Sequence, residues 1–160
     1  MKKLIALFTA VTLLLVMTTT AFAKDRPPAP TEGVAAGSTV AVSEMRSMVQ
    51  PLASALEIDY ASNAISRRSS TCVRLSAITS TFMVCDKITN KFILQKWNGS
   101  AWVDYTSSVS ISGYIMYEFI CTTDKYIPSN AYYRVKTVHY AYRGTETDIV
   151  ELISPYIYLE

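Results

Sequence analysis

From residue 58 onward, β-branched and aromatic residues dominate the chain, and turn-forming residues interrupt them at short, regular intervals. Runs of this kind are typical of strands joined by tight connections. The helical crossovers that parallel strands require are missing between them. The pattern predicts an all-β domain, an antiparallel β-sandwich of two sheets and about seven strands. The expected strands lie near residues 57–61, 64–78, 87–97, 101–109, 114–122, 132–143 and 147–158.

The first residues carry a targeting signal. A basic start, MKK, precedes the apolar run LIALFTAVTLLLVM and the small residues of TTTAFA. This layout is typical of a secretory signal peptide, so residues 1–23 are predicted to be cleaved. The apolar run is shorter than the roughly 18–20 residues that span a bilayer. We therefore expect a secreted, extracellular protein, free or held non-covalently at the cell wall, without a membrane span after cleavage.

Residues 24–56 are predicted to form a flexible leader, because their first part is rich in Pro, Gly, Ala and Ser and has few large apolar side chains. The second part has apolar residues at roughly helical spacing, but Pro51 interrupts it. This part is interpreted either as a short helix or as a segment lying across the domain. The sandwich domain is predicted to occupy residues 57–160.

Charge and motifs argue against several functions. The chain has 15 Lys and Arg against 13 Asp and Glu, and two of the lysines lie in the signal peptide. The exported part is thus nearly neutral, whereas nucleic-acid binders and polybasic membrane binders carry a positive excess. The one histidine, His139, is expected mid-strand and facing inward, the acidic residues are scattered, and no phosphate loop, metal motif or dinucleotide fingerprint occurs. We expect no enzyme activity, no catalytic residues, no metal and no cofactor.

Three cysteines, Cys72, Cys85 and Cys121, form an odd set. They allow one disulfide and one free thiol, or three thiols. Strand alternation places Val73 and Leu75 on the core face and Cys72 on the opposite face, whereas Cys121 is expected to point inward. Because cross-strand neighbours share a face, a disulfide between Cys72 and Cys121 is disfavoured. The sequence leaves any other pairing open.

The stretch ILQKWNGSAWVDY, residues 93–105, places two tryptophans on either side of an Asn-Gly turn. Asn-Gly supplies the positive φ values of a tight hairpin. A loop with an even number of residues puts Trp97 and Trp102 on one face outside the core, either capped by the leader or open to a partner. An odd loop puts them on opposite faces. The match between Phe92 and Leu94 on one strand and Val103 and Tyr105 on the other favours an even loop, and these four residues are then expected to form the core face.

The late strand YYRVKTVHYAYR combines rings with charges. Alternation predicts that its inward positions are Tyr133, Val135, Thr137, His139 and Ala141. The outward positions are Tyr132, Arg134, Lys136, Val138, Tyr140 and Tyr142, and amphipathic rings beside charges favour binding surfaces. Ordinary cross-strand pairing of the rings is the alternative. The candidate ligand surface comprises Trp97, Trp102, Tyr132, Arg134, Tyr140 and Tyr142.

The segments KFILQKWNGSAWVDY and NAYYRVKTVHYAYRG resemble a family of small secreted proteins of Gram-positive bacteria that share a domain of unknown function. The shared motifs are an LQKW-NG-xxWV hairpin and a YYRVKxxHYxY strand, and the resemblance covers roughly residues 57–158. The domain also looks like a fibronectin- or immunoglobulin-type sandwich. This resemblance implies that Tyr133 is a corner tyrosine bonded to nearby backbone and that Val135 is a core residue. It implies no activity.

Together these features predict a non-catalytic binding or adhesion module at the bacterial cell surface. Its expected partner is a glycan, the cell wall or another protein. The alternative is a structural or accessory component of the cell envelope or of a biofilm, with no small ligand.

Overall fold

The computed structural model describes residues 26–46 and 58–160, and all the secondary-structure elements within them are β-strands. The predicted all-β class is therefore confirmed, and all named strand pairs are antiparallel. The predicted signal peptide lies outside the described residues. Within them, no helix has the length and hydrophobicity needed to cross a membrane. The strands are β1 (Val40–Arg46), β2 (Ile58–Ser69), β3 (Cys72–Trp97), β4 (Trp102–Asp104), β5 (Val109–Tyr126), β6 (Ala131–Arg143), β7 (Glu146–Ile153) and β8 (Ile157–Leu159).

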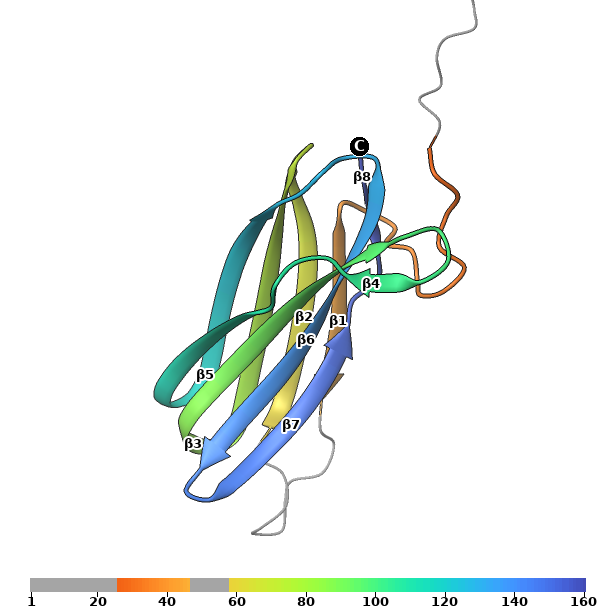
Figure 1. Cartoon of the computed structure of the whole chain (residues 1–160). Helices are drawn as coiled ribbons and strands as arrows, with labels where there is room; N and C mark the ends of the chain where they lie inside the picture. Colours follow the sequence, from red (N-terminus) through yellow and green to blue (C-terminus); the bar gives the residue numbers. More distant parts are fainter. Residues whose placement is uncertain (1–25, 47–57) are drawn as a thin grey trace, which may run out of the picture.

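The strands form one continuous sheet that curls into an open half-barrel, where two separate sheets were expected. Its order is β1-β2-β3-β6-β7, with β4 and β5 also paired to β3 and β8 paired to β6. The long strand β3 explains the difference. Its residues 72–81 pair with β2 and its residues 87–96 with β6, while β5 follows it along both parts. The curl brings β1 and β2 behind β6 and β7, and β2 contacts both (Figure 1).

Two expected strand breaks are wrong. Residues 62–63 were expected to form a turn, but they lie inside β2, whose turn into β3 is at residues 70–71. Residues 79–81 lie inside β3, next to a shift in its register with β5 between Ser80 and Cys85. Bulges of this kind bend a strand without ending it. The polar residues at these positions therefore mark inward positions and a bend.

The sheet begins before residue 57. Strand β1 pairs along its whole length with β2, although its residues belong to the predicted leader. Ahead of it, residues 26–36, here called the strap, lie against the domain. The backbone nitrogen of Ala36 donates to Tyr156 O at 2.9 Å, and that of Tyr156 donates to Val34 O at 2.7 Å. The interpretation of residues 47–57 as a helix or draped segment lies outside the described residues.

The interior contains two apolar clusters separated by polar side chains. Along β6, the predicted inward positions Tyr133, Val135, Thr137, His139 and Ala141 are all fully buried, which confirms the alternation. Tyr133 and Val135 belong to the larger cluster, and Ala141 to the smaller. The same change from apolar to polar and back occurs along β2 and along the second part of β3. The polar residues between the clusters, here called the polar belt, are Asn63, Thr79, Asn90, Thr137 and His139.

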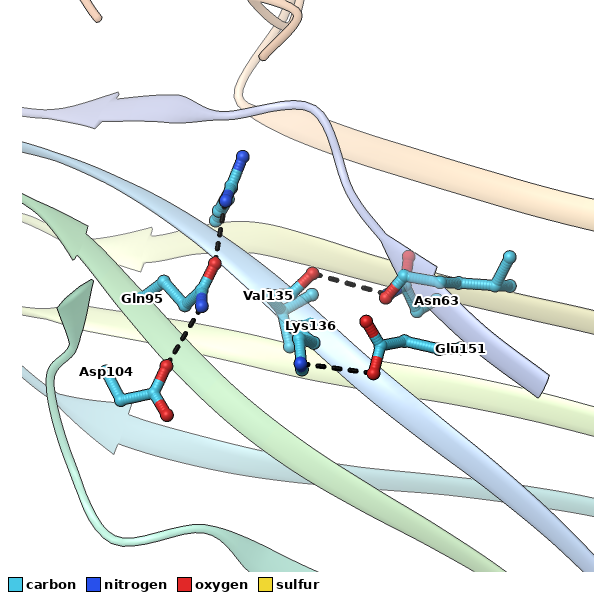
Figure 2. A network of polar contacts seen from close by, with 8 residues as sticks. Asn63, Gln95, Asp104, Val135, Lys136 and Glu151 are labelled. Atoms are coloured by element: carbon cyan, nitrogen blue, oxygen red, sulfur yellow. Dashed lines mark hydrogen bonds and ion pairs between the residues drawn. The ribbon is translucent and has the colours of Figure 1, made fainter. Parts of the chain in front are cut away.

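Hydrogen bonds satisfy most of the polar belt. The side-chain nitrogen of Asn63 on β2 lies 3.3 Å from Val135 O, 3.2 Å from Thr137 Oγ1 and 3.0 Å from Leu152 O, and so ties β2 to β6 and β7. Figure 2 shows the contact between Asn63 and Val135, beside a 3.1 Å ion pair of Lys136 with Glu151. Because buried polar groups without partners are costly, these bonds fix how the curled sheet closes.

His139 is the end of a buried chain of hydrogen bonds. Thr79 donates its hydroxyl proton to Asn90 Oδ1 at 2.6 Å, so it accepts from Nδ1 of His139 at 2.8 Å. Asn90 donates in turn to the Cys121 sulfur at 3.5 Å. Nε2 of His139 is buried and has no hydrogen-bond partner among the described residues. Burial lowers the pKa of His139 to about 4, so the ring is neutral near pH 7.

All three cysteines are buried, and none of them forms a disulfide within the described residues. The β3–β5 register explains why Cys72 and Cys121 are not joined. Cys121 lies opposite Ala77, whereas Cys72 lies opposite Tyr126 at the end of β5. Burial raises the pKa of Cys121, which favours its thiol over the reactive thiolate.

The hydroxyl of Tyr133 donates to the carbonyl oxygen of Pro128 at 2.9 Å. This is the contact with nearby upstream backbone that the resemblance to immunoglobulin-type domains implied for a corner tyrosine. Val135 is fully buried in the larger cluster, as the same resemblance implied. Burial raises the pKa of Tyr133 to about 12, so its hydroxyl stays protonated and keeps donating.

Candidate functional site

The tryptophan hairpin has an even loop, as predicted. Trp97 of β3 lies directly opposite Trp102 of β4, so residues 98–101 form a four-residue loop. The side-chain oxygen of Asn98 accepts from the backbone nitrogen of Ala101 at 2.8 Å, and Gly99 takes a positive φ of 104°. The two rings therefore share a face, with centroids 5.5 Å apart and planes inclined at 60°.

The opposite face of this hairpin only partly matches the prediction. Phe92 and Leu94 are buried in the larger cluster, but Val103 is 40% exposed and Tyr105 is 37% exposed. The hairpin extends away from the curled sheet at β4, and within the described residues β4 pairs with β3 alone (Figure 1). The expectation that Val103 and Tyr105 belong to the core is therefore wrong.

A polar side chain anchors the short strand β4 to its neighbours. Gln95 of β3 donates to Asp104 of β4 at 2.9 Å (Figure 2). Its side-chain oxygen accepts from Nε of Arg134 on β6 at 2.8 Å. Gln95 is itself buried, so it holds both neighbours in defined positions. This arrangement places the guanidinium of Arg134 over the ring of Trp102, 4.4 Å from its centroid.

Five rings from distant parts of the chain form a continuous series, here called the aromatic ladder. Trp102 follows Trp97 and is 5.7 Å from Tyr156. Tyr156 meets Tyr132 edge-on at 5.6 Å, and Tyr132 is 4.9 Å from Tyr158. These separations and inclined planes are those of favourable aromatic pairs. The ladder joins β3, β4, β6 and β8 on the outer side of the sheet.

The strap covers most of this ladder. The guanidinium of Arg26 lies 4.2 Å from the ring centroid of Tyr158 and 5.3 Å from that of Tyr132. Nε of Arg26 donates to the Tyr132 hydroxyl at 3.0 Å, and that hydroxyl donates to Pro27 O at 3.1 Å. Nε1 of Trp102 donates to Glu32 O at 3.0 Å. Tyr132, expected to face outward, is consequently only 3% exposed.

An open groove of about 520 Å³, here called the hairpin groove, remains between the strap, the hairpin loop and the start of β6. Its lining includes the large side chains of Trp97, Tyr132 and Val103 and the polar side chains of Asn98, Asn130 and Lys96. Apolar walls with a few polar groups are typical of ligand sites. The full lining is Pro27, Pro28, Lys96, Trp97, Asn98, Gly99, Val103, Asn130, Ala131 and Tyr132.

The six predicted site residues fall into two groups. Trp97, Trp102, Tyr132 and Arg134 come together around the ladder, as described above. Tyr140 and Tyr142 lie further along β6 and stack on each other, with centroids 6.1 Å apart and planes inclined at 10°. Lys87 lies 5.5 Å from the ring centroid of Tyr142 and 6.0 Å from that of Tyr114. This second group touches the outer face of the sheet and takes no part in the hairpin groove.

Strand β5 carries an apolar surface that the prediction missed. It pairs with β3 alone and so forms an edge of the sheet. The signal is present in YIMYEFI, where apolar residues occupy both faces of one strand. Ile115 is 81% exposed and takes an unusual positive φ of 53°. The other large exposed residues of β5 are Tyr114, Tyr117, Ile120 and Tyr126.

We compared the chain with protein-family models, with curated proteins and with solved structures, and none of the three comparisons gave a match. Function must therefore be argued from the residues themselves. Within residues 26–46 and 58–160, no cluster of three or more His, Cys, Asp or Glu side chains is placed to hold a metal ion. The hairpin groove and the aromatic ladder are the features best suited to binding.

Proposed function

We propose that this chain is a secreted, non-catalytic binding module of the bacterial cell surface and that its ligand docks in the hairpin groove. The groove itself carries the proposal. Its lining combines the partly exposed Val103 with the rings of Trp97 and Tyr132, which are 6% and 3% exposed beside the strap, and with the amides of Asn98 and Asn130. Rings stack on sugars or peptides, and amides donate to and accept from either. The partner is a glycan, the cell wall or another protein.

The chemistry of the groove supports binding without catalysis. Lys96 is the one charged side chain among its lining residues. A nucleophilic or acid–base mechanism needs a base oriented by a second group. His139, the histidine of the chain, is fully buried in the polar belt and is held by Thr79.

The signal sequence supports export, and the bond from Tyr133 to Pro128 supports a relationship to fibronectin- or immunoglobulin-type domains. That relationship, and membership of the secreted Gram-positive family with the hairpin and late-strand motifs, are part of the proposal. In this view the curled sheet is a scaffold, and the hairpin and the strap carry the function.

The test is retention of the purified protein on insoluble cell wall, on immobilised glycans and on surface proteins of the source cell. Val103→Asp puts a charge into the groove at a half-exposed position, so the fold should tolerate it. We expect it to reduce retention at least tenfold. Ile149→Asp is the matched control, because Ile149 is 56% exposed on β7 and does not line the groove. Equal retention of both variants would place the ligand elsewhere.

Strand β5 favours a second candidate function, a structural component that assembles with copies of itself. Long edge strands with exposed apolar side chains are templates for pairing with another chain. Light scattering over a concentration series tests this function. Assembly without any added ligand, and its loss in Ile120→Lys, would support it over the binding module.

A further inference from the structure

The strap has the composition of a peptide ligand. Its first five residues, RPPAP, consist of an arginine followed by four positions of which three are prolines. Such segments favour the extended polyproline II conformation, which loses little entropy on binding. The described part of this stretch contains no helix or strand. Pro30 is buried and Pro27 is half-buried, whereas Arg26, Pro28, Ala29 and residues 31–35 are exposed, so the strap contacts the domain through two of its prolines, the Arg26 side chain and a few backbone groups.

The domain recognises this segment mostly through ring donors and ring faces. Two indole or phenol groups, Trp102 Nε1 and Tyr132 OH, donate to backbone carbonyl oxygens of the strap. The guanidinium of Arg26 makes cation–π contacts with the rings of Tyr132 and Tyr158. Pro27 and Pro28 line the hairpin groove beside Trp97. Aromatic grooves of this design bind proline-rich peptides in other proteins.

We propose that the aromatic ladder and the hairpin groove form a receptor site for an extended, proline-rich peptide that carries an arginine. The strap occupies this site within its own chain, and its residues therefore indicate which kind of peptide the site binds. This inference rests on the proposed function, whose partner class it narrows to a protein segment of the type Arg-Pro-Pro-x-Pro. The partner segment replaces residues 26–30 and leaves the sheet unchanged.

Occupation by the strap sets how a competing peptide behaves. A segment joined by a short connection competes at an effective concentration in the millimolar range. Only residues 37–39 separate the strap from β1, and a side chain added at Gly37 would meet nothing within 4 Å. Residues 31–35 are exposed, so a partner segment can replace residues 26–30 while the backbone bonds of Val34 and Ala36 to Tyr156 stay in place. A separate peptide with the sequence of the strap must therefore bind the wild-type chain weakly. It must bind more tightly to a variant whose own strap contacts the site less strongly.

The probe is a fluorescent peptide with the sequence of residues 24–36, measured by anisotropy against the full chain. In the triple variant Arg26→Ser, Pro27→Gly, Pro28→Gly, the strap loses its arginine and two prolines, whereas the site is intact. We expect the peptide to bind this variant at least tenfold more tightly than wild type. A peptide carrying the same three changes is the matched control, and we expect it to bind at least tenfold more weakly.

Tyr132→Phe, added to the triple variant, keeps the ring but removes the hydroxyl that bonds to Arg26 and Pro27. It should weaken peptide binding several-fold. Equal affinity of wild type and triple variant, or of the two peptides, would overturn the inference. If that happens while Val103→Asp still lowers retention on another partner, only the peptide inference fails. If no tested partner, including the peptide, is retained at all, the proposed function fails as well.

Discussion

Lowering the pH from 7.5 to 5 should destabilise this protein through one residue, His139. The ring is fully buried, its Nδ1 donates to Thr79, and its Nε2 has no partner among the described residues. Protonation would place a charge and an unsatisfied N–H in the interior. The folded pKa of about 4 lies below the ordinary value of 6.5. The unfolded chain therefore binds more protons between these values, and stability present above pH 6.5 is lost as the pH falls towards 4.

The size of the loss follows from the difference between the two pKa values. With 1.36 kcal/mol for each unit, the full effect is about 3 kcal/mol, and about 2 kcal/mol of it is lost by pH 5. This is a large share of the roughly 5–15 kcal/mol that stabilises a typical domain. Because His139 is the one histidine in the chain, no other imidazole contributes in this window.

Urea unfolding followed by tryptophan fluorescence at pH 7.5 and at pH 5 measures this loss directly. His139→Asn is the control, because its amide still donates to Thr79 but does not titrate. We expect the variant to be less stable than wild type at pH 7.5 and to show little further change at pH 5. A wild-type protein equally stable at both pH values, or a variant as pH-sensitive as wild type, would refute the reasoning.

Three other perturbations test the packing. Tyr133→Phe should cost about 1 kcal/mol of unfolding free energy in urea titrations, because the bond to Pro128 is lost; an unchanged value would contradict this role. Gly113→Ala should cost about 1–3 kcal/mol in the same titrations, because the added carbon would lie 2.7 Å from Cδ2 of the Phe119 ring, beside the flexible end of Met116. A thiol reagent such as DTNB should label no cysteine in the native protein and all three in denaturant, and rapid native labelling would contradict their burial. These are Cys72, Cys85 and Cys121.

The sequence predicted well the features that depend on neighbouring residues. Alternation identified every inward position of β6, and the parity argument gave the shared face of Trp97 and Trp102 but not their direct pairing, because both rest on the two-residue period of a strand. The core residue Val135 follows from the same period. The length of β3 was missed, because Thr79 and its neighbours have turn composition although Thr79 lies in the polar belt. Polar residues that bond inside a sheet look the same in sequence as polar residues in a turn.

The candidate site was only partly predictable for a different reason. The outward face of Tyr132 was identified, but its burial depends on Arg26 and Pro27, which are more than a hundred residues away in sequence. The ladder likewise includes Tyr156 and Tyr158, whose contacts follow from β8 pairing with β6. A single sequence holds no local pattern that reports such pairings. Its composition could only show that a leader rich in proline was present.

Strand β3 also sets the order in which this chain can fold when its N-terminal end becomes available first. Its first part can pair with β2 early, but its second part lacks an essential partner until β6, residues 131–143, has appeared. Because β6 in turn pairs with β7 and β8, the last thirty or so residues complete the sheet. The sheet of this topology is therefore completed only when nearly all of the chain is available. Such a delay suits a polypeptide that has to be threaded, still extended, through a narrow channel before it folds.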